Sequence, residues 1–194
     1  MDLKTKAADL FRSSFGGEPV VLARAPGRIE FIGNHTDYNA GTVAARLRTD
    51  GVFTFVTDNG APATTVRGRP LARQEGEAGW VNYPLGVIVA LEARGMPAVA
   101  GLEMAVVSDL PPGAGLSSSA AFELSTALVV CALQRFELTR EDIVKAGREA
   151  ENKFVGVPCG ILDQGVSGFG RRDSLVHIDC RGPVFSTVPM PAGV

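Results

Sequence analysis

Residues 111–136 read PPGAGLSSSAAFELSTALVVCALQRF, and this stretch decides the fold. Gly113 and Gly115 let the backbone turn tightly and approach a ligand without hindrance from a Cβ atom. Three serines then stand where the first turn of a helix is expected, and the apolar run 122–136 is long enough for a buried helix. The stretch therefore predicts a glycine-rich turn that leads into an interior helix.

The same turn is suited to hold an anion. The N-terminus of a helix has unpaired N–H groups and the positive end of the helix dipole, so we expect it to hold the phosphates of a nucleotide. A serine-capped helix after a plain turn explains the same residues equally well. No Lys follows the last glycine, as it does in a Walker loop, and no GxGxxG is present. The candidate nucleotide contacts are Pro112, Gly113, Ala114, Gly115, Leu116, Ser117, Ser118 and Ser119.

The composition is that of a soluble globular protein. The chain has 194 residues, of which 45% are hydrophobic and 21% are charged. Its net charge is −2, so it has no basic stripe to grip a nucleic acid, and no stretch approaches the ~20 apolar residues of a membrane span. Cys131, Cys159 and Cys180 form no CxxC pair. We therefore expect no nucleic-acid or membrane partner, no disulfide framework or zinc site, and a cytoplasmic setting.

Periodicity and turn residues outline the remaining elements. Apolar residues at helical spacing predict helices near the N-terminus and over 80–94, and Thr139 is expected to cap a helix that continues to about residue 154. Pro158 is expected to start another helix over 159–167. Polar residues 33–41 are expected to form a loop, whereas 58–79 show little pattern. The predicted strands are 19–24, 29–32, 52–57, 101–108, 175–179 and 184–188.

Three motifs in this order resemble those of one family. APGR at 25–28 with GNHTDYNAG at 33–41 resembles the first motif of galactokinases. The PPGAGLSSSAA run at 111–121 resembles the second motif of the wider GHMP superfamily of small-molecule kinases, which includes mevalonate and homoserine kinases. ENKFVGVPCGILDQ at 151–164 resembles the galactokinase segment with the catalytic carboxylate. Three independent motifs make a chance resemblance improbable.

The resemblance implies an α+β fold, the GHMP kinase N-terminal domain, in which a mixed sheet is backed by helices, as in a related ribosomal protein domain. It assigns all of residues 1–194 to this domain. It also implies ATP-dependent phosphorylation of galactose at the C1 hydroxyl, with ATP and Mg²⁺ as cofactors and the sugar and ATP as binding partners. Galactokinases continue into a second domain, so we expect this chain to be truncated, to show no more than trace kinase activity on its own, and to self-associate through the uncovered face.

The resemblance also implies catalytic roles for particular residues. Asp163 matches the base that orients or deprotonates the sugar hydroxyl, and Arg28 matches the arginine that lies beside it and faces the γ-phosphate. Ser119 and Glu151 match the ligands of Mg²⁺, a cation that prefers hard oxygen donors. Phosphoryl transfer needs such positioning and such compensation of charge.

Sugar contacts carry over to His35, Asp37, Gly160 and Asp163. A carboxylate that accepts bonds from two hydroxyls distinguishes epimers, because the wrong epimer leaves it unpaired. The galactokinase motif has Glu where this chain has Asn34, which keeps an acceptor and loses the charge. Galactose is therefore the expected substrate, with Asn34 as the position at which another sugar could be preferred.

Residues 42–50 depart from the family pattern. They read TVAARLRTD, which places Arg46 and Arg48 in a strand that is apolar in galactokinases. An unpaired buried guanidinium costs several kcal/mol, so we expect either an exposed strand or a changed register.

Three functions fit these motifs. The first is a galactokinase-like enzyme, and the second is a regulator that binds sugar and nucleotide with little turnover. The third is another kinase of the superfamily, against which the HTDY and CGILDQ segments argue, since those belong to the sugar branch.

Overall fold

The computed structural model describes residues 2–28, 40–110 and 115–190. Its strands are β1 (Val21–Pro26), β2 (Ala40–Leu47), β3 (Val52–Thr57), β4 (Thr64–Arg67), β5 (Leu102–Ser108), β6 (Ser174–Asp179) and β7 (Val184–Pro189). Its helices are α1 (Leu3–Phe15), α2 (Asn82–Glu92), α3 (Ser118–Gln134), α4 (Arg140–Glu149) and α5 (Leu162–Phe169), with a 3-10 helix η1 (Gly76–Val81) and a π-helical segment η2 (Ala150–Val155).

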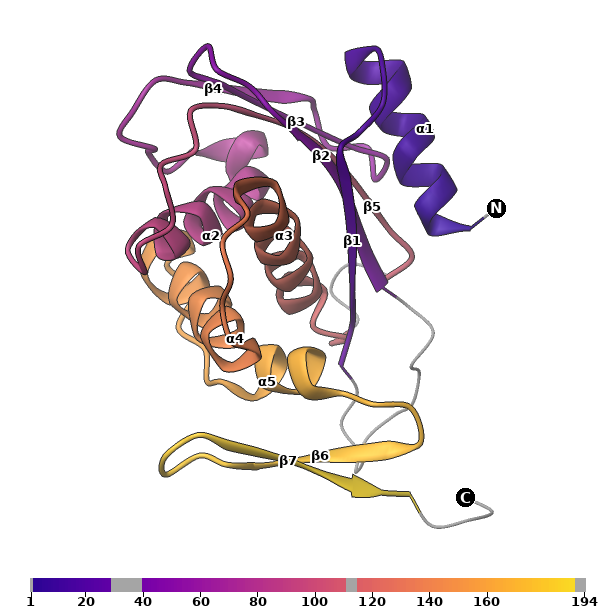
Figure 1. Cartoon of the computed structure of the whole chain (residues 1–194), viewed down its shortest axis with the longest axis vertical. Helices are drawn as coiled ribbons and strands as arrows, with labels where there is room; N and C mark the ends of the chain where they lie inside the picture. The colour runs from indigo at the N-terminus through magenta and orange to yellow at the C-terminus, as the bar shows by residue number, and fades with distance from the viewer. Residues whose placement is uncertain (1, 29–39, 111–114, 191–194) are drawn as a thin grey trace.

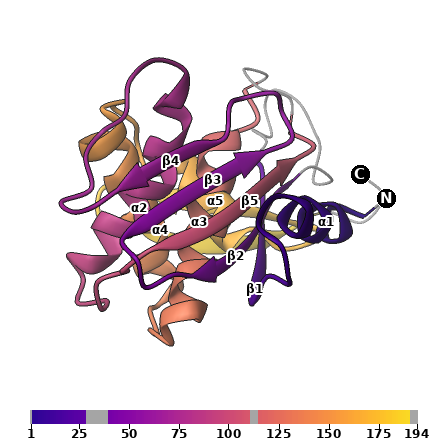
Figure 2. The same ribbon diagram turned by 90° about the horizontal axis from the view of Figure 1, so that it is seen from above.

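The main sheet has five strands in the order β1-β2-β5-β3-β4, which lie side by side in Figure 2. Strands β3 and β5 are parallel, whereas β1–β2, β2–β5 and β3–β4 are antiparallel. Strands β6 and β7 form a separate antiparallel hairpin. The prediction of an α+β fold with a mixed sheet backed by helices is therefore confirmed.

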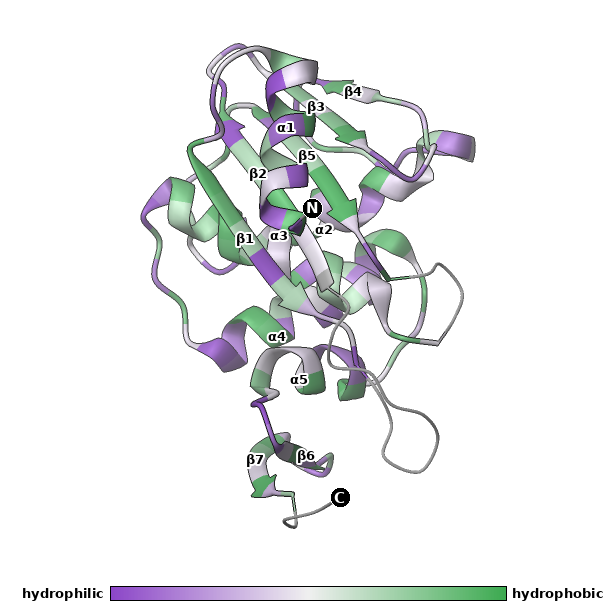
Figure 3. Ribbon diagram, turned by 90° about the vertical axis from the view of Figure 1, so that its right-hand side faces the viewer, coloured by the Kyte–Doolittle hydropathy of each residue, from purple (hydrophilic) through white to green (hydrophobic). Residues whose placement is uncertain are grey.

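Helices cover both faces of this sheet. Helix α1 lies on one face, and α2, α3 and α4 lie on the other, while α5 and the β6–β7 hairpin lie at one end (Figure 1). Figure 3 shows α1 in front of the strands and the hairpin set apart below them. Side chains of β5 are buried on both faces, because Leu102, Met104 and Val106 pack toward α2 and α3 while Ala105 and Val107 pack toward α1. The two faces explain why this strand has no polar alternation.

Most predicted elements are found in the structure. The strands at 52–57 and 184–188 are confirmed, and the Oγ1 of Thr139 accepts a hydrogen bond from the backbone N–H of Asp142 at 3.1 Å, as expected of the cap. Strand β4 lies within 58–79, for which no element was predicted, and helix η1 begins there at Gly76 and runs into the predicted helix 80–94. The predicted strand 29–32 and most of the predicted loop 33–41 lie outside the described residues.

The predicted helix 159–167 is wrong at its start. Helix α5 begins at Leu162, three residues later. The side chain of Asn152 bonds both backbone groups of Cys159, accepting from its N–H at 2.9 Å and donating to its carbonyl at 3.1 Å. A helix from Cys159 would need that carbonyl for the N–H four residues on, so the side-chain pairing delays the helix.

Arg46 near the end of β2 and Arg48 just beyond it are both paired with one carboxylate. Glu103 lies directly opposite Arg46 on β5 and is 5% exposed. Its Oε2 accepts from Nη2 of Arg46 at 2.5 Å and its Oε1 accepts from Nη1 of Arg48 at 2.5 Å. The guanidinium of Arg46 also lies 5.3 Å from the ring centroid of Phe11 on α1. Two arginines are thus accommodated at the end of β2 because one buried carboxylate pairs with both and one aromatic ring lies beside Arg46.

None of the helices in the described part of the chain is long and apolar enough to cross a membrane.

Candidate active site

The end of strand β1 packs tightly against the start of helix α3. A Cβ atom added to Gly27 would lie 2.6 Å from Cδ2 of Leu110 and 2.7 Å from the carbonyl oxygen of Leu116, so only glycine fits there. The next residue, Arg28, donates its backbone N–H to the same carbonyl at 3.0 Å. The APGR motif therefore delivers Arg28 to the N-terminal end of α3.

Arg28 is paired with Asp163 across 135 residues of sequence. Its Nη2 and Nε donate to Oδ1 of Asp163 at 2.5 and 3.0 Å. Both bonds use the same oxygen, so Arg28 does not engage Oδ2. The side chains are 15% and 33% exposed, which makes this a half-buried, charge-assisted pair. Figure 1 shows β1 running down to α5, the helix that carries the carboxylate.

The first residues of α3 have the geometry of an anion site. Gly115 has φ +70° and Ser117, the residue that precedes the helix, has φ 52°, so two successive bends aim the backbone into the helix start. The buried Oγ of Ser117 has no hydrogen-bond partner among the described residues. An unpaired buried hydroxyl beside free helix N–H groups fits a phosphate oxygen. Ser118 and Ser119 open the helix and are half-buried.

A network of buried polar side chains lies behind the pair. Gln164 follows Asp163 on α5 and is fully buried. Its Nε2 donates to Oε2 of Glu151 at 2.7 Å and to Oε2 of Glu123 at 2.9 Å. Glu123 on α3 is 0% exposed and Glu151 on η2 is 6% exposed. One amide therefore joins two carboxylates from two other elements.

Burial changes the acidity of the groups in this network. Loss of solvent raises the pKa of Glu123 well above its ordinary value, and the charge of Glu151 raises it further. Burial and the charge of Glu151 also raise the pKa of Tyr83, and burial together with a hydrogen bond to Glu151 brings the pKa of Cys159 to about 12. Cys159 is therefore a thiol rather than a reactive thiolate.

The loop between Glu151 and Asp163 is held at its middle by the Asn152–Cys159 pairing described above. Gly160 follows this anchor and is exposed, and a Cβ added there would meet nothing within 4 Å. The predicted sugar-contact residue thus faces open space beside the carboxylate-bearing helix. The other predicted contacts, Asn34, His35 and Asp37, lie outside the described residues, as do Pro112, Gly113 and Ala114.

Ser119 and Glu151 are the candidates for a metal site. Within the described residues, no group of three or more His, Cys, Asp or Glu side chains is arranged to hold a metal ion. Mg²⁺ does not require one, since it commonly takes one or two protein oxygens and completes its shell with water and substrate phosphates. A hydroxyl at the start of α3 and a carboxylate on η2 are suitable donors for that mode of binding.

Sequence reasoning missed Glu123, Gln164 and Asn152. Glu123 is the one acidic residue in the apolar run 122–136, and a lone charge in a helix predicted to be buried is a usable signal. Gln164 and Asn152 carried no such signal, because an amide is ordinary in any helix or loop.

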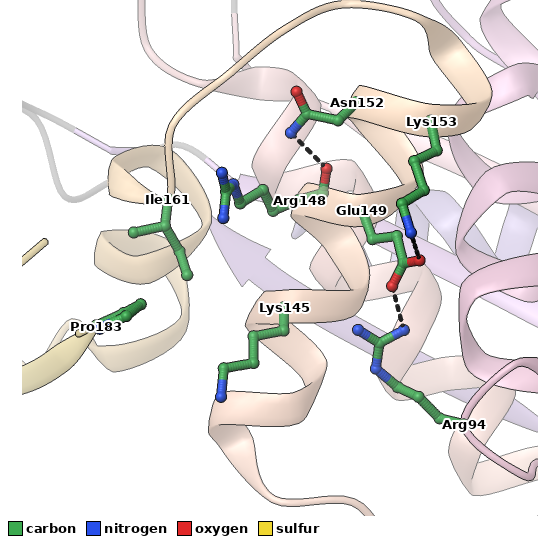
Figure 4. A pocket seen from close by; sticks show the side chains of 8 residues that line it. All are labelled: Arg94, Lys145, Arg148, Glu149, Asn152, Lys153, Ile161 and Pro183. Carbon is green, nitrogen blue, oxygen red and sulfur yellow. Dashed lines mark hydrogen bonds and ion pairs between the residues drawn. The ribbon is translucent and has the colours of Figure 1, made fainter. Parts of the chain in front are cut away.

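A hollow of about 390 Å³, lined largely by basic side chains, lies beside the loop between Glu151 and Asp163. Figure 4 shows Lys145 and Arg148 directed toward Ile161 and Pro183. Its cations largely have partners, since Glu149 pairs with Arg94 at 2.8 Å and with Lys153 at 2.6 Å. A second hollow of about 460 Å³ lies between β1, α3 and α5. Neither is lined by Arg28, Glu151 or Asp163.

Two family profiles match the chain. Residues 82–171 match the GHMP kinases N terminal domain, and residues 9–55 match the galactokinase galactose-binding signature. The first range contains the start of α3, Glu151 and Asp163, and the second contains Arg28.

Curated relatives and solved structures agree with these matches. The chain is 39% identical to a galactokinase of Roseiflexus sp. (strain RS-1) and 37% identical to one of Chloroflexus aurantiacus, covering 95% and 94% of this chain but 49% of each relative. The Lactococcus lactis galactokinase, solved in complex with galactose, superposes with a TM-score of 0.83 at 30% identity, over 97% of this chain and 52% of that one. The Methanococcus jannaschii mevalonate kinase shares the fold, with a TM-score of 0.63 at 18% identity. The chain thus spans about half the length of these proteins.

Proposed function

The chain corresponds to the N-terminal region of galactokinases and has the GHMP kinase N-terminal fold, and from this premise we propose that the protein that carries it catalyses the ATP-dependent phosphorylation of galactose at the C1 hydroxyl. The observation that carries the proposal is the pairing of Arg28 with Asp163 beside the N-terminal end of α3. In this arrangement a carboxylate and a guanidinium lie beside a helix N-terminus that is suited to bind phosphate. We further propose that residues 1–194 form a single GHMP kinase N-terminal domain.

Asp163 acts as the base in this proposal. Its Oδ2 accepts the proton of the C1 hydroxyl as the sugar oxygen forms a bond to the γ-phosphorus and the bond from that phosphorus to the β,γ-bridging oxygen breaks. The products are the sugar 1-phosphate, ADP and the proton. Arg28 fixes the carboxylate through Oδ1 and places positive charge where the transferred phosphoryl group gains negative charge.

The nucleotide phosphates are held by the 111–121 segment. Backbone N–H groups at the start of α3 and the unpaired hydroxyl of Ser117 donate to phosphate oxygens. Ser119 and Glu151 would hold Mg²⁺, which would offset charge on the phosphates. The protein groups therefore bind and orient the nucleotide, while Asp163 handles the proton.

The sugar is held by Asn34, His35, Asp37 and Gly160. Gly160 supports this role because it leaves open space beside the helix of Asp163. Asn34 stands where galactokinases have a glutamate, so the affinity for each epimer depends on an amide rather than a carboxylate at this position.

The proposal is tested by incubating the protein that carries this chain with Mg·ATP and a panel of galactose, glucose and N-acetylgalactosamine. Phosphorus NMR should detect a sugar 1-phosphate with galactose. Sugar and nucleotide binding by calorimetry without any transfer would instead identify a regulator that has lost turnover. Transfer to a different sugar alone would show that galactose is the wrong substrate.

A further inference from the structure

The fully buried amide of Gln164 joins the two elements that carry the proposed metal ligand and the proposed phosphate site. It bonds Glu151 on η2 and Glu123 on α3, and it follows Asp163 on α5. We propose that Gln164 is a positioning residue that fixes the Glu151 carboxylate for Mg²⁺ relative to Asp163. This inference rests on the proposed function, since it gives Glu151 its metal.

An amide is the side chain that this position requires. The two N–H bonds of Nε2 are directed to two carboxylates, and each acceptor is at most 6% exposed. A carboxylate in place of Gln164 would replace the shared donor by a third acceptor, and an apolar side chain would remove that donor from both acids. Lysine would bring a charge into a site without solvent. The bridge therefore depends on the chemistry of Gln164 as well as on its volume.

The metal ligand needs such an anchor because of the segment on which it lies. Glu151 belongs to η2, a π-helical segment in which the regular hydrogen-bonding pattern of α4 ends. Helix α2 approaches η2 closely at Gly86, where a Cβ atom would lie 2.9 Å from Cβ of Phe154 and 3.1 Å from Cβ of Ala150. Backbone packing thus positions η2, and the hydrogen bond from Gln164 positions the Glu151 carboxylate.

Gln164 and Asp163 are neighbours in the first turn of α5 and have different surroundings. The carboxylate of Asp163 is one-third exposed and bonded to Arg28, whereas the neighbouring amide is completely buried. A displacement of this turn would move the proposed base and the anchor of the proposed metal ligand together. The bridge therefore ties the separation of the two carboxylates to one rigid element.

Four variants separate positioning from folding. Gln164→Met keeps the approximate volume and donates no hydrogen bond. Gln164→Asn keeps an amide that is one methylene too short to reach both acids, and it serves if the methionine variant does not fold. Glu123→Gln keeps an acceptor for the bridge. Thr126→Val is the matched control, because Thr126 is a buried residue of the same helix whose Oγ1 has no partner within the described part of the chain.

The experiment measures Mn²⁺ binding to the protein that carries this chain by electron paramagnetic resonance, with and without ADP, and metal-free ADP binding by calorimetry. We expect Gln164→Met to weaken nucleotide-dependent Mn²⁺ binding about tenfold or more, the usual effect of removing an outer-shell partner, and Gln164→Asn to weaken it less. Metal-free ADP affinity should stay within about twofold, as should both affinities in Glu123→Gln and Thr126→Val.

The possible failures are distinguishable. If the unmodified protein and folded Gln164→Met or Gln164→Asn bind Mn²⁺ equally in the presence of ADP, the positioning role is wrong and the proposed kinase function stands. A Gln164→Met protein that loses metal-free ADP binding to the same degree would show a merely structural role. Absence of nucleotide-dependent Mn²⁺ binding by the unmodified protein would overturn the proposed function and this inference with it.

Discussion

Two buried glutamates at opposite ends of the molecule are stabilised in different ways. Glu103 on β5 receives two guanidinium groups, from Arg46 and Arg48, and both of its oxygens are bonded. Glu123 on α3 receives one neutral amide, and its Oε1 has no partner among the described residues. The two guanidinium groups compensate the charge of Glu103 at one end of the β2–β5 strand pair. Glu123 has no cation bonded to its carboxyl group in the described part of the chain, so burial raises its pKa, and groups with such shifted pKa values cluster at functional sites.

The largest expected effect is on catalysis, at Asp163, which lies in the region of Glu123 rather than in that of Glu103. Asp163→Asn removes the proposed base and should lower galactose phosphorylation by a factor of about 100 or more, roughly 2.7 kcal/mol in the barrier. Galactose affinity should change less, since the amide keeps one acceptor. Single-turnover kinetics measures this in the protein that carries the chain. Asp179→Asn, at an exposed carboxylate bonded to Arg181, is the control and should leave turnover unchanged.

The next effect is expected on stability, at the compensated glutamate. Glu103→Ala leaves two guanidinium groups without their shared partner and should lower the free energy of unfolding by about 2 kcal/mol. This is less than for a fully buried pair, because the arginine side chains are 32% and 33% exposed and regain water. Urea denaturation measures it, with Glu103→Gln as the shape-matched control. An unchanged midpoint for Glu103→Ala would show that this cluster contributes no net stability.

A smaller effect, with a defined pH dependence, is expected at Glu123. Burial raises its pKa in the folded state, so the unfolded chain releases the proton more readily and stability falls as pH rises above the ordinary glutamate range. Glu123→Gln removes this titration and should be more stable than the parent by about 1 kcal/mol near pH 7. The difference should shrink toward pH 4.5. Thermal melts across this range measure it, and a difference that grows on acidification would have the opposite sign to that required.

The smallest effect is expected at Arg48. Glu103 keeps its two bonds to Arg46 when Arg48 is removed, and the Arg48 side chain is one-third exposed. Arg48→Met should therefore change the free energy of unfolding by about 0.5 kcal/mol or less. A loss as large as that of Glu103→Ala would show that Arg48, rather than the carboxylate, organises the cluster.

The sequence predicted the local elements well where periodicity or capping is decisive. The pattern of residues 52–57 and the Thr139 cap needed no tertiary information. Strand β4 was missed because 64–67 is short and lies among glycines and prolines, so its identity depends on pairing with β3. The start of α5 was missed because a side chain from another element takes the backbone groups of Cys159.

The candidate site was predictable only in part, because motifs mark some of its residues and tertiary contacts define the others. Arg28 and Asp163 lie in motifs, and the structure brings them together over 135 residues. Gln164 is an ordinary residue until the helices pack, since its role depends on contacts between α3, α5 and η2, whereas Glu123 is marked in the sequence only as a lone acid in an apolar run. The fate of Arg46 and Arg48 was open for the same reason, because Glu103 becomes their partner only through the register of β2 with β5.

The most direct test of the central claim is a double-mutant cycle on Arg28 and Asp163, with galactose phosphorylation by the protein carrying this chain measured in a single turnover. The variants are Arg28→Met, Asp163→Asn and the two combined. If the pair acts as one catalytic unit, the double variant will be about as slow as Asp163→Asn alone, and the two single effects will not add. Rates that multiply, or an Asp163→Asn protein that transfers phosphate at the parent rate, would contradict the assignment of this pair as the catalytic centre.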